Sequence, residues 1–222
     1  MRFVVAAAAV LIVLAGAGIL LKTGPVGTGL VAGPVIAGLL VLLARRAGLS
    51  WDDLGLSRRR LRRGAGWAGL AVAGVAAIYL VAIAFPSLRA AFLDARYRLD
   101  ADSALLKALI LIPLSTVVLE EVAFRGVLFG LLHRRRRAAW AFGFSSVLFG
   151  LWHVFPELPD AGFPYLPANQ LVAAAAIAGI TAALGLVLCE LRRRSGSLLA
   201  AIAGHWAANG LGVLLAALIW TW

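Results

Sequence analysis

Five ionisable side chains and one carboxamide lie inside long apolar runs of this sequence. An ionisable group at the centre of a bilayer costs about 2.5–3.5 kcal/mol on insertion scales, so such groups are rarely kept there without a use. They are therefore the first candidates for chemistry. The six residues are Glu120, Glu121, Arg125, His153, His205 and Asn209.

Spacing sorts these residues onto helix faces. Residues four apart share one face of an α-helix, and this spacing joins Glu121 to Arg125 and His205 to Asn209. Glu120 is rotated by about 100° from Glu121 on the same helix, so Glu120 is not needed for the ion pair with Arg125. We therefore predict a buried ion pair between Glu121 and Arg125, and a second carboxylate, Glu120, that is available for chemistry.

The polar groups also have similar depths on three separate segments. Counted from the nearest arginine cluster at about 1.5 Å per residue, four of them lie roughly 16–24 Å deep, namely Glu120, His153, His205 and Asn209. Phe149 precedes His153 by four residues, which places a ring beside the imidazole. Matched depths on different helices predict that these side chains share one polar cavity.

Such a set suits peptide hydrolysis, which needs a base for water and hydrogen-bond donors for the developing oxyanion. A carboxylate and an imidazole can supply the base, and an imidazole N–H and a carboxamide can supply the donors. Two imidazoles and a carboxylate are also a feasible zinc set. Proton relays in pumps and transporters use the same side chains at membrane depth.

The apolar runs that must position these residues dominate the chain. Of its 222 residues, 63% are hydrophobic and 14% are charged, whereas a soluble domain averages about 45–50% apolar and about 25% charged residues. Runs long enough for a span of about 20 helical residues cover 3–21, 25–44, 65–85, 104–132, 138–155, 168–190 and 198–222.

Backbone groups in lipid must bond to one another, which favours helices. The predicted fold is therefore all-α, a polytopic membrane helical bundle of seven to eight transmembrane helices. The eighth helix would arise if the run 104–132 breaks at Pro113. Because no linker or repeat divides the sequence, we expect a single membrane domain over 1–222, with a motif-bearing catalytic core at 104–222.

Arginine clusters predict the orientation. The net charge is +11, and the basic loops at 45–63, 134–137 and 192–194 alternate with loops of low or balanced charge at 22–24, 86–103 and 156–167. By the positive-inside rule, the N-terminus of a multi-pass protein of the cell membrane would then lie in the cytoplasm. Clusters of this kind are solvated loop charge, so we expect membrane lipids and no nucleic acid as partners.

Three motifs resemble those of the CPBP family, which includes CAAX proteases and bacteriocin-processing proteins and is also called Abi or Rce1-like. Residues 120–125 match EExxxR, residues 149–153 match FxxxH and residues 205–209 match HxxxN. The stretch Asp53-Leu54-Gly55-Leu56 is similar to another feature of this family. Three motifs in order on successive apolar runs are far more specific than any one of them.

This resemblance implies an intramembrane endopeptidase with assigned residues. Glu120 and His153 would activate water, and His205 and Asn209 would hold the oxyanion. The remaining motif residues would shape the site; these are Glu121, Arg125 and Phe149. The implied substrate is a membrane-associated or C-terminal peptide or protein, with prenylation as one option.

Several alternatives stay open beside this interpretation. We favour a metal-free glutamate mechanism without a cofactor, and zinc held by Glu120, His153 and His205 is the alternative. A proton-coupled membrane transporter would use the same buried ionisable groups for another purpose. A scaffold that keeps the fold and has lost catalysis is the third possibility.

Overall fold

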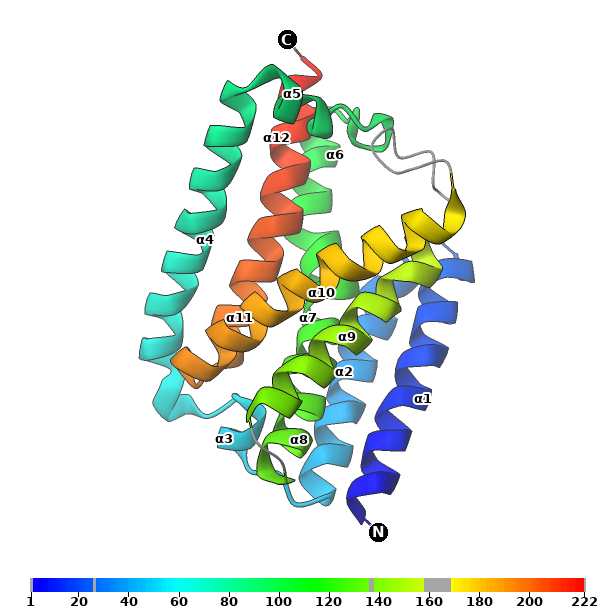
Figure 1. The fold of residues 1–222 in the computed structure, drawn as a ribbon, viewed down its shortest axis with the longest axis vertical. Coiled ribbons are helices and arrows are strands. Elements are labelled where there is room, and N and C mark those ends of the chain that lie inside the picture. The colour runs from blue at the N-terminus through cyan, green and yellow to red at the C-terminus, as the bar shows by residue number, and fades with distance from the viewer. Residues whose placement is uncertain (1, 26, 136–137, 158–168, 222) are drawn as a thin grey trace.

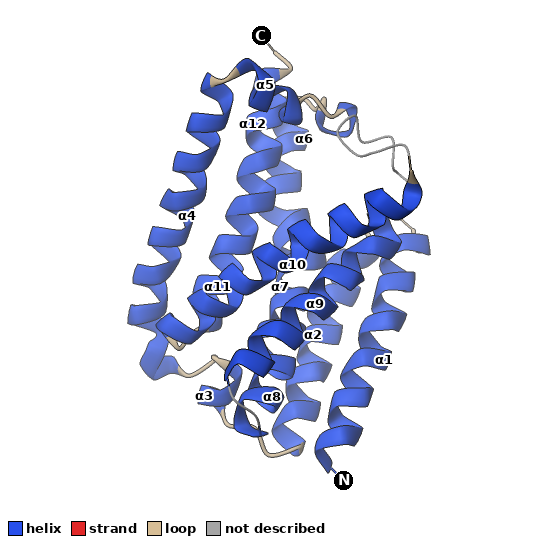
Figure 2. Cartoon of the chain, in the orientation of Figure 1, coloured by secondary structure: helices blue, strands red, loops and turns tan. Residues whose placement is uncertain are grey.

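The structure is a computed structural model that describes residues 2–25, 27–135, 138–157 and 169–221, and over these ranges it contains helices and no strand (Figures 1 and 2). The all-α class is therefore confirmed. Five of the long helices are uninterrupted: α1 (Arg2–Thr23), α2 (Thr28–Arg46), α4 (Leu61–Ala84), α9 (Ala138–Glu157) and α10 (Gln170–Ser195). Shorter elements join them: α3 (Trp51–Leu54), η1 (Arg58–Arg60), α5 (Pro86–Arg89), η2 (Ala90–Phe92) and η3 (Ala95–Tyr97).

Two further long helices are composites of α-helical and π-helical segments. The first consists of α6 (Ala101–Leu106), η4 (Lys107–Leu111), η5 (Pro113–Val117), α7 (Val118–Glu121), η6 (Val122–Leu128) and α8 (Phe129–Arg135). The second consists of α11 (Leu198–Trp206), η8 (Ala207–Leu211) and α12 (Gly212–Ile219). The segments η4, η5, η6 and η8 are π-helical. Such turns are rare and frequently accompany functional sites.

Among the described residues, five helices are long and apolar enough to cross a membrane: Thr28–Arg46, Arg58–Ala84, Ala101–Arg134, Gln170–Ser195 and Leu198–Ile219. Two shorter apolar helical stretches, Ala7–Leu20 and Ala139–Val154, accompany them. Every apolar run predicted from the sequence thus lies on a helix as far as its residues are described. The chain is a multi-pass membrane protein built as a helical bundle.

A break at Pro113, on which an eighth helix would depend, does not occur, so the run 104–132 provides one helix. Residues Ala101–Arg134 form one helix, and Pro113 begins the π-helical segment η5. Proline disrupts an α-helix because its ring meets the carbonyl four residues earlier and its nitrogen carries no hydrogen. A π-turn pairs residues five apart, so Pro113 is accommodated without ending the helix.

In the bundle, α4 stands at one edge and α10 runs at a steep angle to it (Figure 1). Where α9 meets α10 the backbones approach closely, since a Cβ atom at Gly150 would lie 2.3 Å from the carbonyl oxygen of Ala178. Small residues permit such contacts between membrane helices. The largest apolar core surrounds the site helix, with Leu40, Leu119 and Phe124 among its members.

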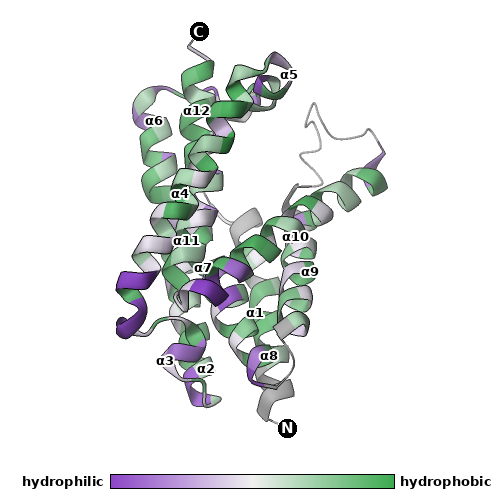
Figure 3. Cartoon of the chain, turned by 60° about the vertical axis from the view of Figure 1, so that its left-hand side comes forward, coloured by the Kyte–Doolittle hydropathy of each residue, from purple (hydrophilic) through white to green (hydrophobic). Residues whose placement is uncertain are grey.

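Hydrophilic segments gather around α3, α8 and the start of α4 (Figure 3). One arginine of the clusters predicted to be solvated is nevertheless buried, because Arg192 is only 5% exposed. Its Nη2 atom donates to the carbonyl oxygens of Asp52 and Asp53, at 2.9 Å each. These carbonyls belong to α3, and the last carbonyls of a helix lack partners within it. The expectation of solvated loop charge was wrong for this residue.

Candidate active site

Two adjacent carboxylates on α7 form the centre of the candidate site. Arg125 Nη1 donates to Glu121 Oε1 at 2.7 Å, and both side chains are fully buried. The ion pair predicted from the four-residue spacing is therefore confirmed. Glu120 is rotated by about 100° from Glu121 on the helix and is 6% exposed. The two neighbours thus differ in what they contact.

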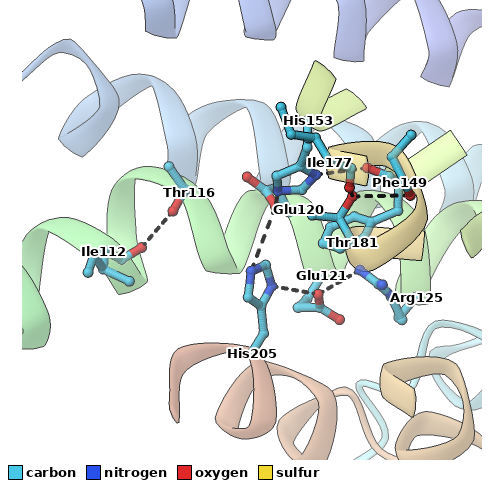
Figure 4. Close-up of polar contacts among 11 residues, drawn as sticks. Ile112, Thr116, Glu120, Glu121, Arg125, Phe149, His153, Ile177, Thr181 and His205 are labelled. Carbon is cyan, nitrogen blue, oxygen red and sulfur yellow. Dashed lines mark hydrogen bonds and ion pairs between the residues drawn. The ribbon is translucent and has the colours of Figure 1, made fainter. Parts of the chain in front are cut away.

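Glu121 has a second partner that its own helix does not supply. His205 Nδ1 lies 2.9 Å from the same Oε1 atom that accepts from Arg125 (Figure 4). Because a carboxylate oxygen accepts, Nδ1 is the donor in this hydrogen bond. The bond leaves His205 Nε2 facing Glu120, where it lies 3.9 Å from Oε2.

His153 is anchored in the same manner from α9. Its Nδ1 donates to the carbonyl oxygen of Phe149 at 2.8 Å, and its Nε2 lies 3.6 Å from Glu120 Oε2. Both imidazoles therefore turn their Nε2 atoms towards one oxygen of Glu120. Within the described residues this oxygen is buried and has no hydrogen-bond partner.

The ring of Phe149 fills the space between these groups. Its centroid lies 4.5 Å from that of His153 and 5.6 Å from that of His205. The Arg125 guanidinium carbon lies 3.9 Å from the Phe149 centroid, within the range of a cation–π contact. Phe149 therefore contacts side chains from all three motifs, and its packing holds the two imidazoles at a fixed separation.

Asn209 lies on η8 and lines one cavity together with Glu120, His153 and His205. The cavity has a volume of about 560 Å³. Phe149 also lines it, whereas Glu121 and Arg125 are not among its lining residues. The structure thus brings the four proposed catalytic side chains to a common space and places the ion pair behind its wall.

Other residues that line the cavity were not singled out from the sequence, and they include Lys107, Thr116, Trp152 and Thr181. Thr116 precedes Glu120 by four residues, so the face of Glu120 already indicated it. Its hydroxyl donates to the carbonyl oxygen of Ile112 at 3.1 Å. Thr181 comes from α10, which carries no motif, and no pattern in the sequence identifies it.

Zinc held by Glu120, His153 and His205 is the alternative for this site. Over the described part of the chain, no group of three or more His, Cys, Asp or Glu side chains is arranged to hold a metal ion. We therefore derive no step through a metal, and the zinc alternative is decided by metal analysis of the protein.

Comparison with known proteins places the motifs in one family. Residues 102–211 match the family described as type II CAAX prenyl endopeptidase, Rce1-like. The matched region contains all three motifs and each residue of the cavity discussed as catalytic. Searches of curated proteins and of solved structures each returned no match.

Proposed function

Because the chain belongs, through residues 102–211, to the Rce1-like family of type II CAAX prenyl endopeptidases, which implies a peptidase, we propose that it hydrolyses a peptide bond by a glutamate mechanism. The observation that carries this proposal is the convergence on Glu120. Two imidazole nitrogens, from His153 and His205, lie 3.6 and 3.9 Å from its unpartnered Oε2.

Water activation belongs to Glu120 and His153. The neutral His153 ring carries its proton on Nδ1, which bonds to Phe149, so Nε2 presents a lone pair. A water molecule that donates one hydrogen to Glu120 Oε2 and the other to His153 Nε2 turns its own lone pairs towards the substrate. Glu120 takes a proton as the water oxygen attacks the carbonyl carbon, and then returns it to the leaving nitrogen.

Stabilisation of the oxyanion belongs to His205 and Asn209. The Asn209 side chain lines the cavity, and its carboxamide can donate through N–H groups. His205 already uses Nδ1–H for Glu121, so it donates through Nε2 only when both ring nitrogens are protonated. Glu121 accordingly orients His205, and Arg125 keeps Glu121 in place.

The substrate class follows from the family and from the position of the site. The family acts on CAAX-type proteins, and the cavity lies within the helical bundle of a membrane protein. We infer a membrane-associated or C-terminal peptide as substrate, with a prenyl group as the feature that would bring it to the bilayer.

The arginine clusters support a cytoplasmic N-terminus. An impermeant thiol reagent should therefore label Arg135→Cys, in a Cys189→Ser background, only from the cytoplasmic side.

The central test measures cleavage of a membrane peptide under single turnover. Glu120→Gln keeps the shape of the side chain and removes its basicity, so the rate should fall by roughly 10²–10⁴-fold. Asn209→Ala should lower the rate by about 10²–10³-fold with little change in substrate binding. Thr116→Ser, which keeps a hydroxyl in the cavity wall, is the matched control and should cleave at close to the wild-type rate.

Two outcomes would redirect the interpretation. Cleavage that is indifferent to both Glu120→Gln and His153→Ala would remove the protease mechanism, and proton-coupled uptake would then test the transporter alternative. One zinc ion per chain, lost together with activity in His153→Ala, would favour the metal-dependent form over the glutamate form.

A further inference from the structure

The segment that carries Asn209 is bound by a residue outside the family match at residues 102–211. The hydroxyl of Tyr79, on α4, donates to the carbonyl oxygen of Ala208, the residue before Asn209. The approach is close at the next turn as well, since a Cβ atom at Gly212 would lie 3.3 Å from the Tyr79 hydroxyl oxygen. Tyr79 is itself held by the edge of Phe92, with the centroids 5.3 Å apart and the rings at 87°.

A second aromatic donor holds the start of the same π-turn. Trp206 Nε1 donates to the carbonyl oxygen of Ala108 at 2.9 Å, which joins the residue before η8 to η4. In η8 the Ala208 carbonyl, and in η4 the Ala108 carbonyl, therefore each accept a hydrogen bond from an aromatic side chain. A π-turn is less regular than an α-helix and needs such support to keep one geometry.

Tyr79 lies on α4, whose inner side packs on α11, since a Cβ atom at Gly204 would lie 3.5 Å from the Cβ atom of Ala71. None of the residues in the most apolar window of Arg58–Ala84 is buried. Tyr79 nevertheless reaches inwards to η8, while Ala208, Asn209 and Gly212 on that side line the cavity. No hydrogen bond made by the Asn209 side chain is found in the part of the chain that is described, so its position depends on the backbone that carries it.

We propose that Tyr79 is a positioning residue for the oxyanion donor Asn209, acting through the carbonyl of Ala208. This inference rests on the proposed function, since it assigns Asn209 the same role. A donor that is misplaced by about 1 Å can lower a rate by about 10²-fold. Tyr79 therefore extends the working site beyond the three motifs to a helix that faces lipid.

The test is a double-mutant cycle on the full-length protein in lipid vesicles. Tyr79→Phe removes the hydroxyl and keeps the ring against Phe92, so folding should be preserved. We expect kcat to fall by about 10-fold with KM within about twofold of wild type. In the Asn209→Ala background the same change should lower kcat by less than about twofold, because the donor that Tyr79 positions is already gone.

A matched control separates positioning from general packing. Trp220 Nε1 donates to the carbonyl oxygen of Asp94 at 3.3 Å, so Trp220→Phe removes an aromatic-to-carbonyl bond elsewhere on the same composite helix. This variant should keep the wild-type kcat. Trp206→Phe, measured in both backgrounds, provides a second route to the answer if Tyr79→Phe does not fold.

The outcomes are distinguishable from a failure of the proposed function. An unchanged kcat in Tyr79→Phe, or an equal loss in both backgrounds, overturns the positioning role while leaving Glu120 and Asn209 as assigned. If Asn209→Ala alone keeps the wild-type kcat, the oxyanion assignment fails first, and the role of Tyr79 falls with it.

Discussion

Two buried arginines in this protein donate to different kinds of acceptor. Arg125, fully buried at the candidate site, is paired with the carboxylate of Glu121 at 2.7 Å. Arg192, 5% exposed at the end of α10, makes no ion pair within the described residues and donates to two backbone carbonyls of α3. One cation is paired directly with a carboxylate, and the other is held by carbonyls at a helix end, with the charges of Asp52 and Asp53 acting on it from nearby.

From this difference we expect Arg125, and not Arg192, to affect the proposed chemistry. The carboxylate that balances Arg125 also binds His205, so any change in the pair reaches the proposed oxyanion donor. One of the two carbonyls that bind Arg192, that of Asp53, belongs to the Asp53-Leu54-Gly55-Leu56 stretch. The Gly55 carbonyl also accepts from the Leu198 backbone N–H at 2.8 Å, at the first residue of α11. Arg192 therefore secures the start of a helix rather than a reacting group.

The largest effect is expected from Glu121→Gln. Removing one partner of a buried ion pair leaves an uncompensated charge, so the free energy of unfolding should fall by about 3–5 kcal/mol. Cleavage should fall as well, because a neutral amide oxygen accepts more weakly from His205 Nδ1 than the carboxylate oxygen does. Thermal unfolding in detergent checks the first effect, and Glu120→Gln, which breaks no such pair, is the control. Equal stability of the two variants would contradict the distinction between the neighbouring carboxylates.

A smaller loss is expected from Arg192→Met. It removes the side-chain donor to the Asp52 and Asp53 carbonyls, of which the Asp52 carbonyl keeps the Gly55 N–H at 3.0 Å. The free energy of unfolding should therefore fall by about 1–3 kcal/mol. Protein matched for folding should retain kcat within about threefold. Arg193→Met is the matched control, because Arg193 is half exposed and paired with Glu190 at the surface, where substitutions usually change stability by about 0.5 kcal/mol or less. A strong loss of kcat in folded Arg192→Met would contradict the expectation that Arg192, unlike Arg125, affects stability and not catalysis.

The smallest effect is the coupling between Gly55 and Arg192. Gly55 has φ +74°, and a Cβ atom there would lie 2.4 Å from Arg192 Nε. In wild type, Gly55→Ala should therefore both strain the backbone and displace the guanidinium, whereas in Arg192→Met only the backbone strain of about 1–2 kcal/mol should remain. Unfolding of the single and double variants gives the coupling, which we expect at about 1 kcal/mol. Strict additivity would show that the guanidinium does not rest on Gly55.

Much of the architecture was predictable because helices in lipid leave a strong signal. Apolar runs identified the helices, and a four-residue spacing identified the Glu121–Arg125 pair on one face. What periodicity does not specify is how one helix is rotated against another. The bond from His205 to Glu121 joins residues 84 positions apart, and no pattern within either helix selects it. The catalytic roles of Glu120, His153, His205 and Asn209 stay predictions.

Other features were missed because the sequence signal was ambiguous. Arg192 lies in a run of three arginines that all look like loop charge, and only the fold shows that one of them turns inwards beneath α3. Pro113 is a helix breaker in most contexts, and the π-turn that accommodates it has no sequence signature. Tyr79 lies on a lipid-facing helix outside the motifs, so its bond to Ala208 becomes visible only in three dimensions.

The placement of Glu121 and Arg125 on one helix has a consequence for how the protein is made. During synthesis the helix Ala101–Arg134 reaches the membrane before α9, α10 and α11 have emerged from the ribosome. Each charge would oppose its transfer into lipid by about 2.5–3.5 kcal/mol if it entered alone. As neighbours on one face they enter as a neutral pair. Insertion of this helix therefore does not depend on a partner from a later helix, such as His205, to neutralise its charges.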